Sequence, residues 1–490
     1  MFRARYDAAQ TTDENAKHWA NADYLSAAAA NSPDVRGKLR SRARLERDNN
    51  SYCSGMVETL ARHIIGTGPR LQVKTRNRDA NRRIADEFED WAEEIGLAEK
   101  LQTACEAKIV DGESFLVMAN NPRLATAVKL DLQDVEADQV TTPDLFVPTP
   151  LATDGIVYDA YRNPIEYHVL EAHPGDMATV AWNKYNRIPA HFVLHWFKRR
   201  RPGQLRGVPE ITAALPLFAL HRRFGLATVS AAEIAALFAA IVKTTMQPDD
   251  DTEALTAFDT QAIERGMMTA LPEGYDVTQL KAEQPTTTYE MFDRANIRQI
   301  ARCIHMPRSI AAGDSADLNY SSGQLDHQVY RWMIGLERYT VETRALKRIF
   351  REWLSEARKA SPWVADAIGP GVSPRISWNW DGFKHADPLK ESLAQYQRLL
   401  NGTTSLQREC NQEGYSRDDT LDEIAEDRRA CEERGIPYPG DPIPVPAADS
   451  DSDSDQAEAN RPTRHSNDPR SLFGRDGRQA VAAYLSGRDA

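Results

Sequence analysis

The sequence predicts an α+β fold that is mainly helical. Apolar residues recur every three or four positions through most of the chain, which is the period of an amphipathic helix. Residues 114–197 instead contain short runs of β-branched and aromatic residues between turn-forming ones, a pattern typical of strands. The 490 residues are 41% hydrophobic and 27% charged, which fits a soluble protein of about three domains with a large core.

Periodicity and breaker residues delimit the expected helices. The first periodic stretch, 35–65, stops at the breaker cluster Gly66-Thr67-Gly68-Pro69. A later one, 208–240, has Pro209 in its first turn, where a missing N–H costs nothing, and an alanine-rich face that allows close helix packing. The other expected helices cover residues 78–95, 97–110, 289–305, 353–369, 388–402 and 405–435.

Strands are expected in three places. Residues 156–161 and 165–170 are the arms of a hairpin, and 191–197 is a buried strand. A compact insert at 241–282 combines strands with an acidic helix. Residues 376–380 form one further short strand.

Residues 313–353 are the most informative part of the chain. A polar, turn-rich loop leads into a long helix, and we expect Ser321 and Gln324 to form a capping box at its start. Apolar residues then follow in alternating steps of four and three, interrupted only by Thr343: Leu325, Val329, Trp332, Leu336, Tyr339, Leu346, Phe350 and Trp353. At about 1.5 Å per residue, the stripe is roughly 43 Å long. It requires a packing partner along its whole length, and the core of the same subunit is the simplest one.

Charge and cysteine content exclude several classes of protein. A net charge of −12 argues against strong sequence-independent DNA binding, which needs several Lys or Arg on phosphates. The five cysteines lie more than twenty residues apart without a Cys-x-x-Cys pair, so we expect free thiols. We expect no membrane span and no secretory signal. One basic cluster fits a solvated helix face better than a site for phosphates or an acidic partner: Arg36, Lys38, Arg40, Arg42, Arg44 and Arg47.

The sequence shows no enzyme motif. It has no G-x-S-x-G elbow, P-loop, kinase signature or metal-ligand cluster, so we expect no enzyme activity, no cofactor and no metal. His191 and His195 are four apart, but they lie in a strand and lack the glutamate of H-E-x-x-H. Asp314, Ser315 and Asp317 are the most site-like group, and a helix-entry loop with Asx and Ser turns explains them more simply than catalysis does.

Three segments together resemble the lambda-type portal proteins of tailed bacteriophages. The first runs from Arg44-Leu45-Glu46-Arg47-Asp48-Asn49-Asn50 to Gly66-Thr67-Gly68. The second is Gly203-Gln204-Leu205-Arg206-Gly207-Val208-Pro209. The third is Ala311-Ala312-Gly313-Asp314 followed by Asn319-Tyr320-Ser321-Ser322. Each is weak alone, and their order and spacing match over roughly residues 35–435.

The resemblance implies a portal fold of wing, stem, clip and crown, assembled as a ring of usually twelve subunits. Asp314, Ser315, Asp317, Asn319 and Tyr320 would then lie at or near the channel. The implied parts are an N-terminal arm (1–34), the wing (35–205), a stem helix (206–240), the clip (241–284), a returning stem helix (285–306), a channel loop (307–324), the long helix with wing completion (325–387), crown helices (388–436) and a disordered acidic tail (437–490).

The resemblance also implies the partners. The ring would sit at one capsid vertex of the virion, after assembly in the host bacterial cytoplasm. Double-stranded DNA would pass through its channel without sequence specificity, during packaging and ejection. The ring would contact the terminase large subunit, the major capsid protein, the scaffold and the head-tail connector proteins, and no membrane.

Two other readings of the sequence stay open. One is a metal-dependent nucleic-acid-processing enzyme with a site around Asp314, Asp317 and Asp381; nuclease activity that is lost on Asp→Ala changes would favour it. The other is an adaptor that binds partners through its helices. A ring-shaped particle with an axial hole would favour the portal over both.

Overall fold

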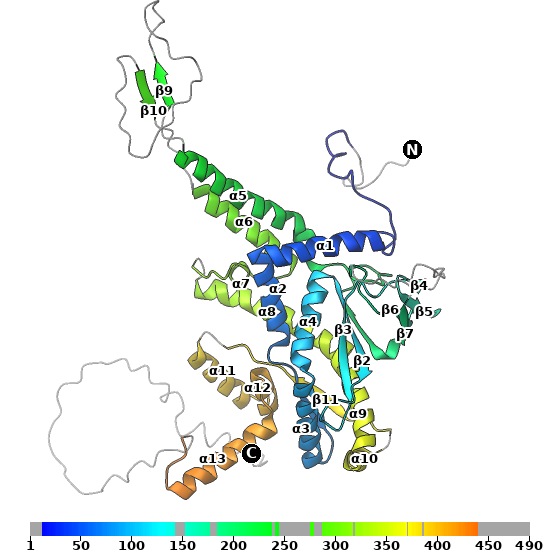
Figure 1. Ribbon diagram of the computed structural model, residues 1–490. Helices are drawn as coiled ribbons and strands as arrows, with labels where there is room; N and C mark the ends of the chain where they lie inside the picture. The colour runs from blue at the N-terminus through cyan, green and yellow to red at the C-terminus, as the bar shows by residue number, and fades with distance from the viewer. Residues whose placement is uncertain are drawn as a thin grey trace, which may run out of the picture. The chain divides into compact units, whose positions relative to one another are not determined.

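The computed structural model is mainly helical, with several small sheets (Figure 1). It describes residues 12–142, 152–176, 184–237, 241–244, 275–278, 287–316, 319–369, 371–384 and 387–439. The chain divides into two compact units, with the boundary between Glu423 and Ile424. The expected α+β class, rich in helix, is therefore confirmed. All five cysteines are free thiols, as their spacing predicted.

Two helices, α1 (Pro33–Asn49) and α2 (Ser51–Ile65), replace the single helix expected over 35–65. The break falls at Asn50, which has an extended backbone and whose side chain accepts hydrogen bonds from the backbone N–H groups of Tyr52 and Cys53. Asparagine is among the best N-caps, so it starts a second helix at this point. The expected stop at Gly66 is confirmed, with a φ of 62°.

The main core gathers around α3 (Arg78–Glu94) and α4 (Leu97–Val110), both as expected. Phe88 of α3 makes edge contacts with Phe350, Trp353 and Trp378. Trp378 belongs to β11 (Arg375–Asn379), which pairs antiparallel with β1 (Arg70–Lys74). The core therefore joins segments that are about 300 residues apart in the chain.

The β-rich region forms two antiparallel sheets. In the first, β2 (Glu113–Asn120) lies between β3 (Leu130–Val135) and β8 (Val193–Phe197). The second has the order β4 (Ala152–Thr153), β5 (Ile156–Tyr158), β6 (Pro164–Leu170) and β7 (Tyr185–Pro189). The expected hairpin is the β5–β6 pair, and the expected buried strand is β8, preceded by the short 3-10 turn η2 (Ala190–Phe192).

A pair of antiparallel helices follows. A 3-10 turn, η3 (Glu210–Ala214), leads into α5 (Leu215–Leu237), and α6 (Thr287–Cys303) returns beside it (Figure 1). Phe224 of α5 stacks on Tyr289, and His221 contacts Asp293 at 2.6 Å. Between the helices, β9 (Ile241–Thr244) pairs with β10 (Tyr275–Thr278). The rest of the expected insert, including its acidic helix, lies outside the described residues.

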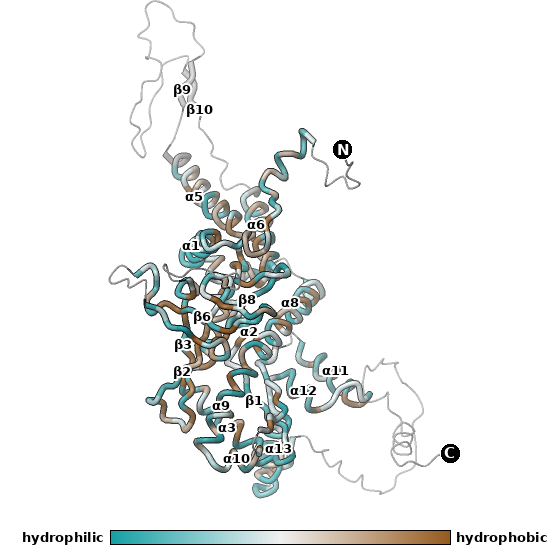
Figure 2. The backbone as a smooth tube through the Cα atoms, turned by 90° about the vertical axis from the view of Figure 1, so that its right-hand side faces the viewer, coloured by the Kyte–Doolittle hydropathy of each residue, from teal (hydrophilic) through white to brown (hydrophobic). Residues whose placement is uncertain are grey.

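A long helical segment forms after the short α7 (Arg308–Ala312). It consists of α8 (Tyr320–Val341), a π turn η4 (Glu342–Leu346) and α9 (Lys347–Ala360), followed by α10 (Pro362–Ile368). Figure 2 shows hydrophobic residues recurring among hydrophilic ones along α8. The expected stripe is buried only in its second part, at Leu346, Phe350 and Trp353. The expectation that its own subunit covers the whole stripe is wrong.

The π turn explains why the stripe changes from exposed to buried. A π turn takes up one more residue than an α turn, so the positions after it are rotated by about 100° relative to an unbroken helix. That rotation brings Leu346, Phe350 and Trp353 toward the core formed by α3 and β11. The residues before the turn stay on the outer side of α8.

Three helices close the described chain: α11 (Pro388–Leu400), α12 (Leu406–Glu413) and α13 (Arg417–Arg434). The expected helix over 405–435 is split, because Gly414 adopts a left-handed conformation with a φ of 89°. The expected disordered acidic tail lies outside the described residues from position 440 onward.

Candidate functional site

The loop over 313–320 is built from local turns. Gly313 ends α7 in a left-handed conformation, and the backbone N–H of Asp314 bonds to the carbonyl oxygen of Ser309 at 3.1 Å. The Asp314 carboxylate accepts a hydrogen bond from the N–H of Ala316, an Asx turn. Ser315 is exposed, and Asp317 lies outside the described residues.

The cap of α8 differs from the expected capping box. Asn319, not Ser321, is the N-cap: its side chain accepts a hydrogen bond from the N–H of Ser322 at 2.8 Å. Tyr320, Ser321 and Gln324 lie inside the helix and are exposed. Asparagine is at least as good a cap as serine, so the helix begins two residues earlier than expected.

Asp381, a member of the alternative enzyme site, has a structural role. Its carboxylate accepts hydrogen bonds from the backbone N–H and the hydroxyl of Thr67, at 2.6 and 2.7 Å. It thereby fastens the end of α2 to the chain after β11. The carboxylate is occupied by the Gly-Thr-Gly turn, and no observation joins it to Asp314.

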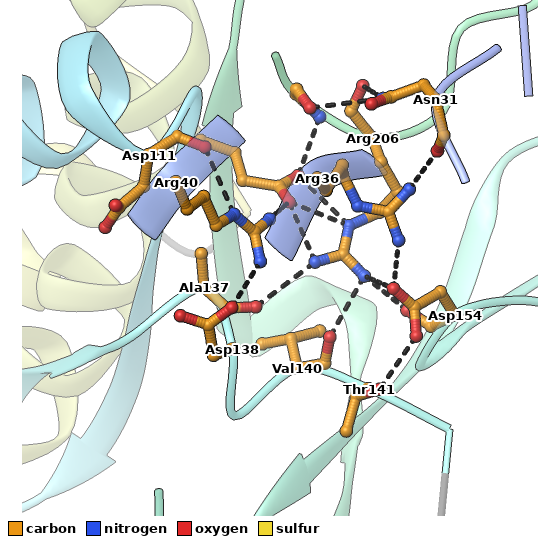
Figure 3. Close-up of polar contacts among 12 residues, drawn as sticks. Asn31, Arg36, Arg40, Asp111, Ala137, Asp138, Val140, Thr141, Asp154 and Arg206 are labelled. Atoms are coloured by element: carbon orange, nitrogen blue, oxygen red, sulfur yellow. Dashed lines mark hydrogen bonds and ion pairs between the residues drawn. The ribbon is translucent and has the colours of Figure 1, made fainter. Parts of the chain in front are cut away.

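The second segment that resembles the portal family contains Arg206, which lies among several ion pairs and hydrogen bonds (Figure 3). The Arg206 side chain is 1% exposed and ion-pairs with Glu113 at 2.8 Å and with Asp154 at 3.3 Å. It also donates hydrogen bonds to the carbonyl oxygens of Ala137 and Val140. Glu113, which is fully buried in β2, also binds Arg40. Arg36 binds Asp154.

We call Arg36, Arg40, Glu113, Asp154 and Arg206 the Arg206 network. Burial disfavours the charged form of Glu113. The charges of Arg206 and Arg40, together with a hydrogen bond with His195, nevertheless hold the pKa of Glu113 well below its usual range. Burial, with the neighbouring charge of Arg206, lowers the pKa of Arg36 to about 10. The Glu113 carboxylate and the Arg36 guanidinium group therefore remain charged at neutral pH. They hold α1, β2 and the turn before α5 together.

Other residues of the same segment shape that turn. The Gln204 side chain accepts hydrogen bonds from the N–H groups of Arg200 and Arg201 and donates to the carbonyl oxygen of Arg206. Gly207 is a glycine for steric reasons, because an added Cβ would overlap the carbonyl group of Gly112. The two backbones touch directly at this point.

A second buried ion group lies at the start of the helix pair. The Lys108 ammonium is 2.8 Å from Glu210 of η3 and 2.8 Å from Glu337 of α8. Although burial opposes its charge, these two carboxylates raise the pKa of Lys108. We call Lys108, Glu210 and Glu337 the Lys108 triad. The triad borders a small cavity that is also lined by Tyr330 and His305.

The basic cluster of α1 is neither a solvated face nor a phosphate site as a whole. Arg36 and Arg40 are buried in the Arg206 network. Arg44 binds Asp111 at 2.7 Å, and Arg47 binds Glu106 at 2.8 Å. Sequence reasoning missed these partners because each lies more than fifty positions away in the chain, and no local pattern marks it.

One group of potential metal ligands occurs among the described residues: Glu136, Asp138 and His173. Arg44 already lies 3.8 Å from Glu136 and 2.8 Å from Asp138. The Nδ1 atom of His173 accepts a hydrogen bond from the N–H of Gly175, so in the neutral ring Nε2 carries the proton and faces the carboxylates. Ion pairing and hydrogen bonding account for this group, and we assign no metal to it.

Comparison with known proteins identifies the family. The model of the lambda family of phage portal proteins matches residues 13–337, which is more than half of the chain. The chain belongs to this family. The portal family resemblance of the three sequence segments is thereby confirmed. Portal proteins are structural components of phage particles, so the prediction that this chain is not an enzyme is confirmed as well.

Individual relatives agree with the family. A probable portal protein of Halomonas phage phiHAP-1 is 25% identical over 438 residues, which cover 82% of each chain. A chain in the neck of an empty GTA particle has a TM-score of 0.46 and 15% identity, covering 77% of this chain and 94% of that one. A chain in the neck of the native GTA particle has a TM-score of 0.46 and 14% identity, covering 78% and 94%. Both structural likenesses are distant.

No helix among the described residues is both long enough and apolar enough to cross a membrane.

Proposed function

We propose that this portal protein forms a closed ring, usually of twelve subunits, at one vertex of the phage capsid. Double-stranded DNA passes through the ring during packaging and ejection. The proposal rests on membership of the portal family over residues 13–337. A net charge of −12 per chain suits a conduit along which DNA slides, because most of its surface repels the phosphates.

The parts of a portal map onto the elements as follows. The wing comprises α1 to β8 and is completed by α8 to β11. The stem is the antiparallel pair α5 and α6, and the clip includes the β9–β10 ladder between them. The crown comprises α11 to α13. The Arg206 network and the Lys108 triad then lie where the stem joins the wing, so they fix the direction in which the stem leaves it.

The segment 307–324 is the proposed channel loop. Within it, Asp314, Ser315, Asn319 and Tyr320 are intermediate or exposed in burial. Asp314 and Asn319 make local turn contacts, Asp314 also lies 3.9 Å from Arg308, and Tyr320 contacts Lys390. A loop that faces a passage needs such a free polar surface. At the clip the ring docks the terminase large subunit and later the head-tail connector proteins. The wing contacts the capsid and scaffold proteins.

Imaging and native mass spectrometry of the purified chain test the proposal. A dodecamer has a mass of about 660 kDa, twelve times 54.9 kDa, with an axial hole in averaged images. A chain that remains a monomer across all assembly conditions, including the presence of capsid and scaffold proteins, would refute it. A metal-dependent nuclease activity that disappears in Asp314→Ala would refute it in favour of an enzyme.

A further inference from the structure

The helix α8 has two apolar faces on opposite sides. Tyr330, Ile334 and Val341 are buried against the core of the same subunit. At about 100° per residue, the second face lies on the other side of the helix, within an arc of about 80°. It consists of Leu325, Val329, Trp332, Leu336 and Tyr339, each between 48% and 72% exposed. We call these five residues the outer stripe.

The outer stripe does not have the composition of a solvated surface. The four charged residues of α8 are Asp326, Arg331, Glu337 and Arg338, and by the helical period none of them falls within its arc. Two of them are used inside the subunit: Glu337 in the Lys108 triad, and Arg338 in hydrogen bonds to the carbonyl oxygens of Ile64 and Asp381. Depletion of charge together with Trp and Tyr characterises the centre of a protein interface.

The size of the outer stripe also fits an interface. An aromatic side chain buries about 150–250 Å² when fully covered, and Leu or Val buries less, so five residues that are 48–72% exposed offer about 500–700 Å². An exposed apolar patch of that size is at the upper limit for a monomer. It approaches the roughly 800 Å² that each partner contributes to a stable protein interface.

Gly335 lies about 40° outside this arc, on the side of Tyr339, by the helical period. An added Cβ there would meet nothing within 4 Å, so the fold of the subunit does not require glycine at this position. A glycine inside a helix is less stable than alanine. Trp332 and Tyr339, three residues before it and four after it, are its neighbours on the helix surface, so a partner's side chain can fill the space beside the outer stripe.

We propose that the outer stripe packs against a second copy of this chain, as part of the contact between neighbouring subunits. This inference rests on the proposed ring. Each subunit of a closed ring contacts the next copy through two different surfaces, and an exposed apolar area close to that of a stable interface is suited to be one of them. The contact repeats around the ring, so that one uncovered stripe per chain becomes one buried stripe per interface.

Two substitutions test the inference. Trp332→Lys places a charge in the outer stripe, and Gly335→Leu fills the space above the helix. Trp332 is mostly exposed and a Cβ added at Gly335 meets nothing within 4 Å, so both variants should keep the circular dichroism spectrum and the melting midpoint of the wild-type subunit. Both should lose ring assembly at concentrations where the wild type is fully assembled. Tyr161→Lys, at the exposed turn between β5 and β6, is the matched control and should assemble normally.

The identity of the partner is tested by photocrosslinking. A photoreactive amino acid at position 332 should give a product of about 110 kDa, twice the mass of one chain. A crosslink within one chain, for example to residues 437–490, would overturn the inference, as would the absence of a crosslink in assembled rings. So would normal assembly of both variants, or equal loss of assembly in Tyr161→Lys. A wild-type chain that never assembles contradicts the proposed function instead.

Discussion

Replacing Arg206 by methionine removes the cation that neutralises a fully buried carboxylate. Glu113 keeps Arg40 and His195 as partners, but it loses an ion pair of 2.8 Å and two hydrogen bonds from the Arg206 Nε atom. Breaking a buried ion pair by removing one partner costs about 3–5 kcal/mol. The carbonyl oxygens of Ala137 and Val140 lose their donor too, at about 1–3 kcal/mol for each buried group left unpaired. We therefore expect Arg206→Met to lower the local stability around β2 by at least about 4 kcal/mol.

Amide hydrogen exchange measures this loss where it occurs. A chain of several domains need not unfold in one step, so a local readout is preferable to a single melting transition. At about 1.4 kcal/mol per factor of ten, protection of the β2 amides should fall roughly 1000-fold in Arg206→Met. Arg223→Met is the control, because Arg223 is exposed on α5 and no described residue pairs with it. We expect it to change protection by about twofold at most.

A double substitution separates the two contributions. Adding Glu113→Gln to Arg206→Met removes the carboxylate charge that has lost one of its two arginine partners, so the pair should cost less than the sum of the two single changes. A fall in protection of less than tenfold in Arg206→Met would refute the reasoning. Strict additivity in the double variant would show that the two side chains do not stabilise each other.

Three further predictions follow from single contacts. Gly207→Ala forces a Cβ onto the carbonyl group of Gly112 and should lower the free energy of unfolding by at least about 1–3 kcal/mol, measured by denaturant titration. Gly55→Ala, with open space around it, should instead stabilise α2 by about 0.5–1 kcal/mol. Equal effects of the two changes would contradict the observed crowding at Gly207. Asn319→Ala should lower the free energy of unfolding by about 0.5–2 kcal/mol and speed hydrogen exchange at the first amides of α8, whereas Ser321→Ala should do neither. The reverse result would favour the capping box of Ser321 and Gln324. Burial lowers the pKa of His63 and His195, so the unfolded chain binds more protons than the native one once the pH falls below about 6.5. The free energy of unfolding should be greatest above that pH and should fall as the pH drops through the lowered native pKa values. Thermal midpoints measured between pH 8 and 5.5 would show this fall. The dependence on pH should be weaker in a chain that carries His63→Gln and His195→Gln.

Local pattern predicted most of the helices but not where they break or what they contact. The helices α3, α4, α6 and α11 follow from apolar spacing, since that signal lies within one turn or two. The break at Asn50 was missed because periodicity continues across it, and only the side-chain cap reveals a new start. The strand β1 was missed because its partner β11 lies about 300 residues later, and a five-residue strand has little signal without its partner.

The candidate site shows the same limit more sharply. The segment Gly203 to Pro209 could be recognised by resemblance, yet its sequence does not reveal that Arg206 is buried or that Glu113 is its partner. Long-range ion pairs leave no period in the sequence. The arginines of α1 were read as surface residues for that reason. The stripe over 325–353 was predicted to be one packing surface, and the structure confirms burial only for its second part, because the π turn that divides it has no sequence signal that we recognise.

The Lys108 triad gives one amine two counterions on separate parts of the chain. Glu210 lies in η3, just before α5, and Glu337 lies about one turn before the end of α8. Moving either element away would leave the buried ammonium with one counterion instead of two, so the ion group resists displacement of both. The protein thus carries a mechanical coupling between its two longest helices that depends on a single proton staying in place.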